Sequence, residues 1–405
     1  MFWDRPIDSA LNRLKRDVRA PVRVELWDGR GVDLSDEAPR VTLRLTDART
    51  AAALARPSML ALAEAYIEGG LELDGDIREA IRSAEALSRT HSEETFERAS
   101  RAGVHRTRAA DRAAVRHHYD VSNEFYALWL DPRMVYSCAY FRTAADSLEQ
   151  AQVAKLDHIC TKLRLAPGEK LLDIGCGWGA LVMHAVERYG VDATGVTLSE
   201  NQFRLANERI RAAGLEGRCR VLLEDYRDHP GEARYDKVAS VGMFEHVGLK
   251  NLPAYFGSVR RLLRERGLFL NHGITSSDVG SRSVGLGGGE FIDRYVFPKG
   301  ELAHLHRVIG DMSGEAFEVH DVECLRPHYV RTLENWSAAF ERHLGAAVAA
   351  SSERTTRIWR LYLAGCAHAF EQRWISIYQI LASKAQGPGL AQLPLTRDWI
   401  YRDSF

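Results

Sequence analysis

The sequence has little net charge, and this shortage excludes one class of protein. Its 54 basic residues nearly balance its 55 acidic residues, which leaves a formal net charge of -1. Proteins that bind nucleic acids carry a clear excess or clustering of positive charge, because their ligand is a polyanion. We therefore expect no nucleic-acid partner, and a contact with a membrane surface would have to come from a local patch.

The sequence also lacks the cysteine spacing of a metal site or of a disulfide framework. Its 6 cysteines include no CxxC pair. A chain of 405 residues can bury a large core and does not need disulfides to fold. We expect no metal and a reduced, cytoplasmic protein.

Long apolar segments are missing as well. The N-terminus MFWDRPIDSALNRLKR is basic but has no apolar core, which a secretory signal would require. No window of about 18 uncharged apolar residues follows it. We therefore expect a protein that is neither secreted nor inserted across a membrane.

The pattern of segments predicts two domains joined by a linker. Residues 1–90 combine short β-like runs with a helical pattern, which indicates a small α+β domain. Residues 91–115 are polar and basic, and they predict a solvated linker or an exposed helix, with a contact to lipid headgroups as the alternative. Residues 116–405 then form the second and larger domain.

The larger domain alternates strand-like and helix-like segments. The predicted strands are KLLDIG, VDATGVTLS, CRVLLED, YDKVASVG and GLFLNHGIT, with helical patterns between them. Such alternation predicts an α/β fold with a parallel, doubly wound sheet. After residue 329 the pattern is mostly helical, and its apolar positions have the spacing of a buried helix face.

A glycine-rich loop follows the first of these strands. In KLLDIGCGWGAL, Asp173 precedes Gly175, Gly177 and Gly179, and a helix follows directly. Glycines let the backbone approach a ligand, and a helix N-terminus favours negative charge. The acid would repel a pyrophosphate but pairs well with an ammonium group, which favours S-adenosylmethionine over a dinucleotide. The alternative is a tight turn without a ligand.

The second strand lacks the acid that a generic methyltransferase offers to the cofactor ribose. Only Thr197, Glu200 and Gln202 are candidates in GVTLSENQ. The third strand ends in LLEDYRD, which places Asp225 and Tyr226 beside the same ligand, because these loops flank the switch point of such a sheet.

Seven segments carry a resemblance to a known family: HHYDVSNEFYALWLDPRMVYSCAYF at 117–141, LLDIGCGWGAL, GVTLSENQ, LLEDYRD, VGMFEHVG, NHGIT and RLYLAGCAHAF. Over roughly residues 110–385 they resemble the cyclopropane-fatty-acyl-phospholipid synthases and their mycolic-acid relatives. Residues 1–90 resemble, more loosely, the lipid-associating domain of the bacterial phospholipid enzymes. The resemblance implies a Rossmann-like class I methyltransferase with a helical, lipid-binding cap.

The resemblance also implies a cofactor site and a reaction. S-adenosylmethionine would bind nine residues of the motifs and loops above: Tyr136, Ser137, Asp173, Gly175, Gly177, Thr197, Gln202, Asp225 and Tyr226. Its methyl group would go to the cis double bond of an unsaturated phospholipid acyl chain, and loss of a proton would close a cyclopropane ring. The intermediate is a carbocation, so the site must be dry and aligned.

Aromatic faces stabilise such a cation. The matching motifs offer six of them, although each is also a candidate for the ordinary core. They are Tyr119, Tyr136, Tyr140, Phe141, Phe244 and Tyr362.

In this family a bicarbonate ion accepts the proton. The residues at the matching positions are Cys138, Glu245, His272, Ile274 through its backbone, and Tyr362. Glu245 would form one wall of an anion site, with hydrogen bonds from His272 and Tyr362, and an acid that faces an anion implies a shared proton. We expect Cys138 to line the site rather than act as a nucleophile, because the reaction forms no acyl-enzyme.

Two features leave alternatives open. His246 has no role in this scheme and is expected to cap the loop. The segment SSDVGSRSVGLGGGEFIDRYVFPKGEL at 276–302 is rich in glycine, which indicates a mobile lid or a close backbone approach. Small changes around the cation decide whether the product is a ring, a methyl- or methylene-branched chain, or, after addition of water, a hydroxylated branch.

Two other functions compete with lipid methylation. One is a small-molecule N- or C-methyltransferase, and the other is a non-catalytic lipid-binding protein on the same fold. The N-terminal domain and the full set of Cys138, Glu245, His272 and Tyr362 argue against the first, and the intact glycine loop and carboxylate argue against the second. Because acyl chains lie in the bilayer, we expect peripheral association with the inner face of the membrane. The sequence leaves a homodimer open.

Overall fold

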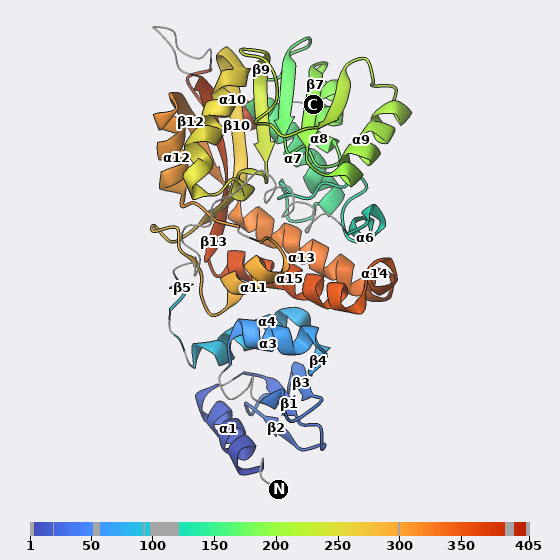
Figure 1. Cartoon of the computed structure of the whole chain (residues 1–405), viewed down its shortest axis with the longest axis vertical. Coiled ribbons are helices and arrows are strands. Elements are labelled where there is room, and N and C mark those ends of the chain that lie inside the picture. The colour runs from blue at the N-terminus through green and yellow to red at the C-terminus, as the bar shows by residue number, and fades with distance from the viewer. Residues whose placement is uncertain are drawn as a thin grey trace.

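The computed structural model describes most of the chain. The described residues are 4–18, 20–51, 57–90, 92, 94–97, 121–298, 300–384 and 393–401. The molecule is elongated, with an α/β layer at one end, a layer of helices in the middle and a small N-terminal unit at the other end (Figure 1). Most of the predicted linker and Tyr119 lie outside the described residues.

A seven-stranded sheet forms the centre of the α/β layer, in the order β12-β13-β10-β9-β6-β7-β8. Among these strands only β13 runs antiparallel to its neighbours. This confirms the predicted parallel-rich, doubly wound sheet. The strands are β6 (Lys170–Ile174), β7 (Asp192–Thr197), β8 (Cys219–Leu223), β9 (Tyr235–Val241), β10 (Leu263–Ser276), β12 (Phe317–Cys324) and β13 (Ile375–Lys384).

Helices cover both faces of this sheet, because its strands carry apolar side chains on both sides. One core cluster holds buried residues of α7, α8 and α9. A second cluster holds buried residues of α10 and α12. The helices are α7 (Leu148–Lys162), α8 (Ala180–Tyr189), α9 (Glu200–Ala212), α10 (Leu252–Leu262) and α12 (Leu305–Gly314), and the short α16 (Asp398–Tyr401) packs against α7.

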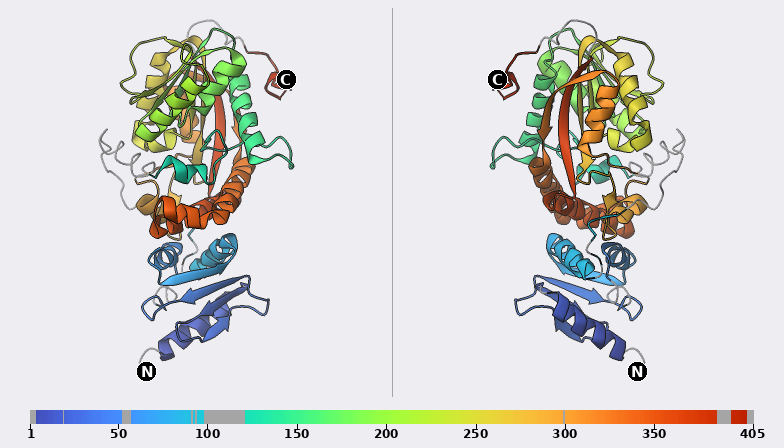
Figure 2. Two further views of the ribbon diagram at one scale, coloured as in Figure 1. Left: turned by 90° about the vertical axis from the view of Figure 1, so that its right-hand side faces the viewer. Right: turned by 90° about the vertical axis from the view of Figure 1, so that its left-hand side faces the viewer.

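The middle layer is a cap of helices that lies across one edge of the sheet (Figure 2). Its longest helix, α15, carries a buried apolar residue at nearly every turn, and it packs against α13. The cap helices are α6 (Asn123–Ala127), α11 (Gly288–Tyr295), α13 (Arg326–Arg342), α14 (Leu344–Ala350) and α15 (Glu353–Glu371).

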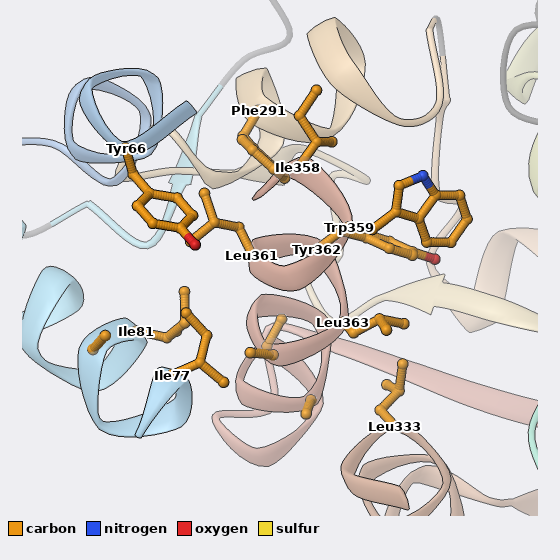
Figure 3. Packing of buried hydrophobic residues seen from close by; sticks show 14 of the residues in the cluster. Tyr66, Ile77, Ile81, Phe291, Leu333, Ile358, Trp359, Leu361, Tyr362 and Leu363 are labelled. Carbon is orange, nitrogen blue, oxygen red and sulfur yellow. The ribbon is translucent and has the colours of Figure 1, made fainter. Parts of the chain in front are cut away.

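The N-terminal unit is a four-stranded sheet in the order β2-β1-β3-β4, and its described residues also form α1, α3 and α4. Helices α3 and α4 lie between this sheet and α15, where Tyr66 and Ile81 point towards Leu361 (Figure 3). Its elements are α1 (Asp4–Asp17), β1 (Val22–Glu25), β2 (Gly31–Asp33), β3 (Val41–Leu45), α3 (Met59–Ile67), β4 (Leu71–Gly75) and α4 (Ile77–Arg89).

Polar contacts surround the apolar interface between this unit and the cap. Glu85 of α4 bonds the ring of His368 at 2.6 Å, and Arg357 of α15 pairs with Glu72 at 2.7 Å. Part of the predicted linker also takes part, since β5 (Phe96–Glu97) pairs with β11 (Ser283–Val284).

The glycine-rich segment before α11 makes a close backbone approach to the N-terminal unit. The N–H of Met59 donates to Leu286 O at 2.8 Å. Gly287 has φ +84°, and a Cβ there would stand 2.7 Å from the Leu60 nitrogen. Glycine at this position is therefore required by both its conformation and its neighbour.

We expect Gly287→Ala to lower the free energy of unfolding by ~1–3 kcal/mol, the scale of a left-handed backbone position without glycine. The adjacent Gly288→Ala is the control, because its Cβ would meet Val284 at an ordinary 3.4 Å. That variant should stay within ~0.5 kcal/mol of the wild type. Urea unfolding measures the free energy of unfolding of both variants. An equal decrease in the two would contradict the interpretation that Gly287 is required by its close approach to Leu60.

Candidate active site

A cavity of about 300 Å³ opens at the carboxyl ends of β6, β7, β8 and β9. Strand ends meet there because the strands are parallel, and ligands of doubly wound sheets bind at this edge. All nine predicted cofactor residues line it: Tyr136, Ser137, Asp173, Gly175, Gly177, Thr197, Gln202, Asp225 and Tyr226. We call it the cofactor cavity.

The glycine loop forms the floor of the cofactor cavity. Gly175 has φ +81°, and a Cβ there would lie 2.8 Å from Met243. Gly177 has φ +55°, and no atom lies within 4 Å of the place where its Cβ would be. The first glycine therefore permits packing within the protein, whereas the second leaves open space beside the cavity.

Asp173 shows that the cavity suits a cation. Its side chain is 2% exposed, and its Oδ1 has no hydrogen-bond partner among the described residues. Burial raises the pKa of this carboxyl to about 7. A buried acceptor without a donor fits the ammonium group of S-adenosylmethionine.

The ends of β7 and β8 place hydroxyl, amide and carboxylate groups in the lining of the cofactor cavity. Thr197 donates its hydroxyl to the Gln202 amide oxygen at 2.7 Å, and both side chains are buried. Asp225 accepts from the Arg227 guanidinium at 2.6 Å. Glu200, the third candidate, is exposed and pairs with Arg204, so it does not line the cavity.

A second cavity of about 290 Å³ extends from the sheet through the cap to the N-terminal unit. We call it the apolar cavity, because most of its lining is aliphatic or aromatic. All five predicted catalytic residues line it: Cys138, Glu245, His272, Ile274 and Tyr362. Sequence positions more than 200 apart are thus brought to one wall.

Glu245 lies in a short 3-10 turn, η1 (Phe244–His246), which begins after two residues that follow β9. Its Oε1 accepts the backbone N–H of Ile274 at 2.7 Å, and its Oε2 is buried without a hydrogen-bond partner among the described residues. Burial raises the pKa of this carboxyl to about 7. The side chain can therefore hold or release a proton near neutral pH.

His272 lies on β10 and is fully buried. The Gln379 amide nitrogen donates to Nδ1 at 3.1 Å, which assigns the ring proton to Nε2. That Nε2 has no hydrogen-bond partner among the described residues. Burial lowers the pKa of the ring well below its usual value, so His272 is a neutral donor.

The Cys138 thiol is buried and lies 3.7 Å from Leu325 O, to which it donates. Burial raises its pKa, and a protonated thiol is a poor nucleophile. This setting suits a residue that lines the site.

Two of the predicted aromatic residues face the apolar cavity, and their hydroxyls meet: Tyr136 and Tyr362 lie 3.1 Å apart. Tyr136 is held by an aromatic cluster that includes Trp129 and Trp336, with ring centroids 5.3 and 5.4 Å away. Three other candidates line neither cavity: Tyr140 stacks between His158 and His328, Phe141 lies under Arg331, and Phe244 is buried beside the sheet.

The two cavities share part of their walls. Four residues line both: Tyr136, Ser137, Gly242 and His246. The ring of His246 also packs 5.2 Å from Phe297. Sequence reasoning expected only a loop-capping role for His246, and the structure places it where the cavities meet.

Sequence reasoning also missed Lys155, which lines the cofactor cavity and donates to Ser137 Oγ at 2.8 Å. The signal was a lysine on the buried face of a helix, one turn from Ala151 and one turn from Ile159.

The sheet order and the paired cavities define a class I S-adenosylmethionine-dependent methyltransferase. A family model described as mycolic acid cyclopropane synthetase matches residues 106–380. The chain belongs to this family. A second model, described as a domain of unknown function, matches residues 11–95.

Two curated relatives cover nearly the whole chain, and their names fit this family. A probable fatty acid methyltransferase of Pseudomonas putida is 48% identical over 96% of this chain and 98% of its own. The cyclopropane-fatty-acyl-phospholipid synthase of Escherichia coli K12 is 37% identical over 90% of this chain and 94% of its own.

Among solved structures, mycolic acid cyclopropane synthase CmaA1, complexed with SAH and CTAB, is 38% identical with a TM-score of 0.64. It covers 67% of this chain and 98% of its own. The cyclopropane synthase MmaA2 from Mycobacterium tuberculosis is 34% identical over the same shares, with a TM-score of 0.65.

We expect Gly177→Val to weaken binding of S-adenosylhomocysteine by about 100-fold or more, because the branched side chain overfills the loop beside the ligand. The control is Gly214→Val, which also has positive φ, +68°, and open space, but lies outside the cavity. Titration calorimetry measures both. Equal weakening would show that backbone strain, rather than the cavity, explains the loss.

Proposed function

We propose that this enzyme transfers the methyl group of S-adenosylmethionine to the cis double bond of an unsaturated phospholipid acyl chain and closes a cyclopropane ring. The observation that carries the proposal is the junction of the two cavities at Tyr136, Ser137, Gly242 and His246. One cavity suits a charged cofactor, and the other suits an apolar chain.

The relatives support the same substrate class. Their names include a fatty acid methyltransferase and a cyclopropane-fatty-acyl-phospholipid synthase, and one solved relative is a complex with SAH and CTAB. Within the described residues, none of the helices is long and apolar enough to cross a membrane. A peripheral contact with the bilayer is therefore part of the proposal, since the acyl chain must leave the membrane to enter the cavity.

Bound S-adenosylmethionine would supply an electrophilic methyl group at its sulfonium. The chain's own residues then have three tasks. The apolar walls exclude water, so that an alkene can compete as the nucleophile. Tyr136 and Tyr362 line the apolar cavity, where aromatic rings stabilise the positive charge that develops on the acyl chain. The fixed walls align the chain with the cavity junction.

The remaining task is removal of a proton, for which we propose a bicarbonate ion. Two unpartnered buried atoms in the apolar cavity fit it: the Nε2–H of His272 is a donor, and Glu245 Oε2 accepts the bicarbonate hydroxyl or shares a proton with it. The neutral state of His272 and the raised pKa of Glu245 keep this wall from carrying two fixed charges.

We expect the purified enzyme to convert unsaturated phospholipid vesicles to cyclopropane lipid, identified by mass spectrometry, with NMR to separate a ring from a methylene or methyl branch. Glu245→Gln should lower turnover by a factor on the order of 10², the scale of lost general-base function, and leave binding of S-adenosylhomocysteine unchanged. Bicarbonate depletion should slow the wild type but add little to the variant.

The matched control is Glu301→Gln. Glu301 also lines the apolar cavity, and it also accepts a backbone N–H, from Leu249 at 3.0 Å. This variant should keep near-normal turnover and its bicarbonate response. If bicarbonate depletion slows the wild type and Glu245→Gln by the same factor, the proposed anion site is wrong.

We also propose that the N-terminal domain binds the far part of the acyl chain. Aliphatic side chains of its strands and helices form that end of the apolar cavity: Leu43, Leu62, Leu71, Leu73, Ile81 and Ala84. Each methylene of the acyl chain that is buried there stabilises the complex by ~0.8 kcal/mol. The length of the cavity should therefore determine which acyl chains bind best.

We expect Ala84→Phe to shift the product distribution towards shorter acyl chains, because the ring occupies space at the end of the cavity. Ala86→Phe, on the same helix but outside the cavity lining, should keep the wild-type distribution. Competition between phospholipids of different chain length measures the ratio in one reaction. An unchanged ratio in Ala84→Phe would place the chain elsewhere.

A further inference from the structure

The cofactor cavity contains a lysine that the mechanism above does not use. Lys155 of α7 is 2% exposed and lines the cavity together with Asp173 and the glycine loop. Among the described residues its ammonium makes one hydrogen bond, to Ser137 Oγ at 2.8 Å. An ammonium group has three donors, so two directions are left for a ligand.

Lys155 also lacks a counter-ion. No carboxylate of the described residues lies within ion-pair distance of it. Lys162, further along the same helix and just as buried, pairs with Glu323 at 2.6 Å and with Asp321 at 3.1 Å. A buried charge without a partner is costly, so Lys155 indicates that an anion enters this cavity.

The same cavity also holds an acidic side chain without a partner among the described residues, Asp173. Its buried Oδ1 lacks a partner, and the two side chains influence each other electrostatically without forming an ion pair. One unpaired cation and one unpaired anion, held apart on one wall, match a zwitterion. The methionine moiety of S-adenosylmethionine is a zwitterion, with an ammonium and a carboxylate on one carbon.

We propose that Lys155 binds the carboxylate of the methionine moiety, while Asp173 takes its ammonium group. The inference rests on the proposed function for the identity of the cofactor. The other anion in that proposal, bicarbonate, is a less suitable partner, because its five proposed contacts line the apolar cavity and Lys155 does not.

The test compares two ligands in the full-length protein. S-adenosylhomocysteine carries the amino-acid moiety, and 5′-methylthioadenosine lacks it. We expect Lys155→Met to weaken S-adenosylhomocysteine by about 10- to 100-fold, the range for a lost hydrogen bond to a charged group, and to leave methylthioadenosine unchanged. Calorimetry measures both affinities, and the second also shows that the variant is folded.

The control is Lys237→Met. Lys237 is 9% exposed, lies on β9 and pairs with Glu169 at 3.5 Å, away from both cavities. This variant should bind both ligands as the wild type does.

A pH series gives a second readout that a purely structural lysine would not move. The charged and titratable groups that face Lys155 are Asp131, Asp173, Cys138 and His272. Burial lowers the pKa of Lys155 to about 8 in the ligand-free protein. The affinity of the wild type for S-adenosylhomocysteine should therefore fall as the pH rises above about 8, because the neutral amine no longer attracts the carboxylate. This fall should be absent in Lys155→Met.

Several results would overturn the inference. One is equal weakening of both ligands in Lys155→Met, and another is unchanged affinity for both. A third is unchanged cofactor affinity combined with a lost response of turnover to bicarbonate, which would assign the anion to the reaction base instead. If the wild type bound neither nucleoside, the proposed function itself would fail.

Discussion

The site depends on the position of one short segment, Tyr136–Ser137–Cys138, which separates the cofactor cavity from the apolar cavity. A transferred methyl group must cross this boundary, so an error of an ångström in the segment would misalign both substrates. The segment is held from several sides. The Gln152 amide donates to Ser137 O at 3.0 Å, and Lys155 donates to Ser137 Oγ. The aromatic cluster around Tyr136 and the bond from the Cys138 thiol to Leu325 O complete the support.

Three of the buried polar atoms without a hydrogen-bond partner among the described residues belong to side chains that line the two cavities. Asp173 Oδ1, Glu245 Oε2 and His272 Nε2 are all buried, and each faces a cavity. A native interior satisfies most such atoms, because an unmade hydrogen bond costs about 1–3 kcal/mol. Ligands that supply the missing partners would recover this free energy on binding. The arrangement therefore favours ligand-bound states over the empty protein.

The fold and the cofactor wall could be predicted from sequence because their signals are local. A strand that ends in a glycine loop and a helix specifies its own geometry, and parallel strands bring all such ends to one edge. Seven of the nine predicted cofactor residues lie at or just after the ends of β6, β7 and β8. The other two, Tyr136 and Ser137, lie between α6 and α7, and only the family resemblance indicated them. Which cavity or core a side chain faces depends on residues far away in the sequence, and the sequence predicted this less well. Tyr140 and Phe141 belong to the same motif as Tyr136, and Phe244 precedes Glu245 in another, yet none of these three rings lines either cavity. Lys155 is a single charge in an ordinary buried helix, and only its neighbours in space reveal that it lacks a partner.

The helix α15 connects the N-terminal unit to the apolar cavity. Its Leu361 faces Tyr66 and α4, whereas Leu363 faces Leu333 of α13 (Figure 3). One helix thus forms a wall of the apolar cavity and the interface between domains. The match to the catalytic family begins at residue 106, and the solved mycobacterial relatives cover 67% of this chain. The side chains that line the far end of the cavity come from α3, α4, β3 and β4, before that match begins. The five predicted catalytic residues therefore lie within the part of the chain that the family model matches, whereas the far end of the cavity is formed by residues that precede it.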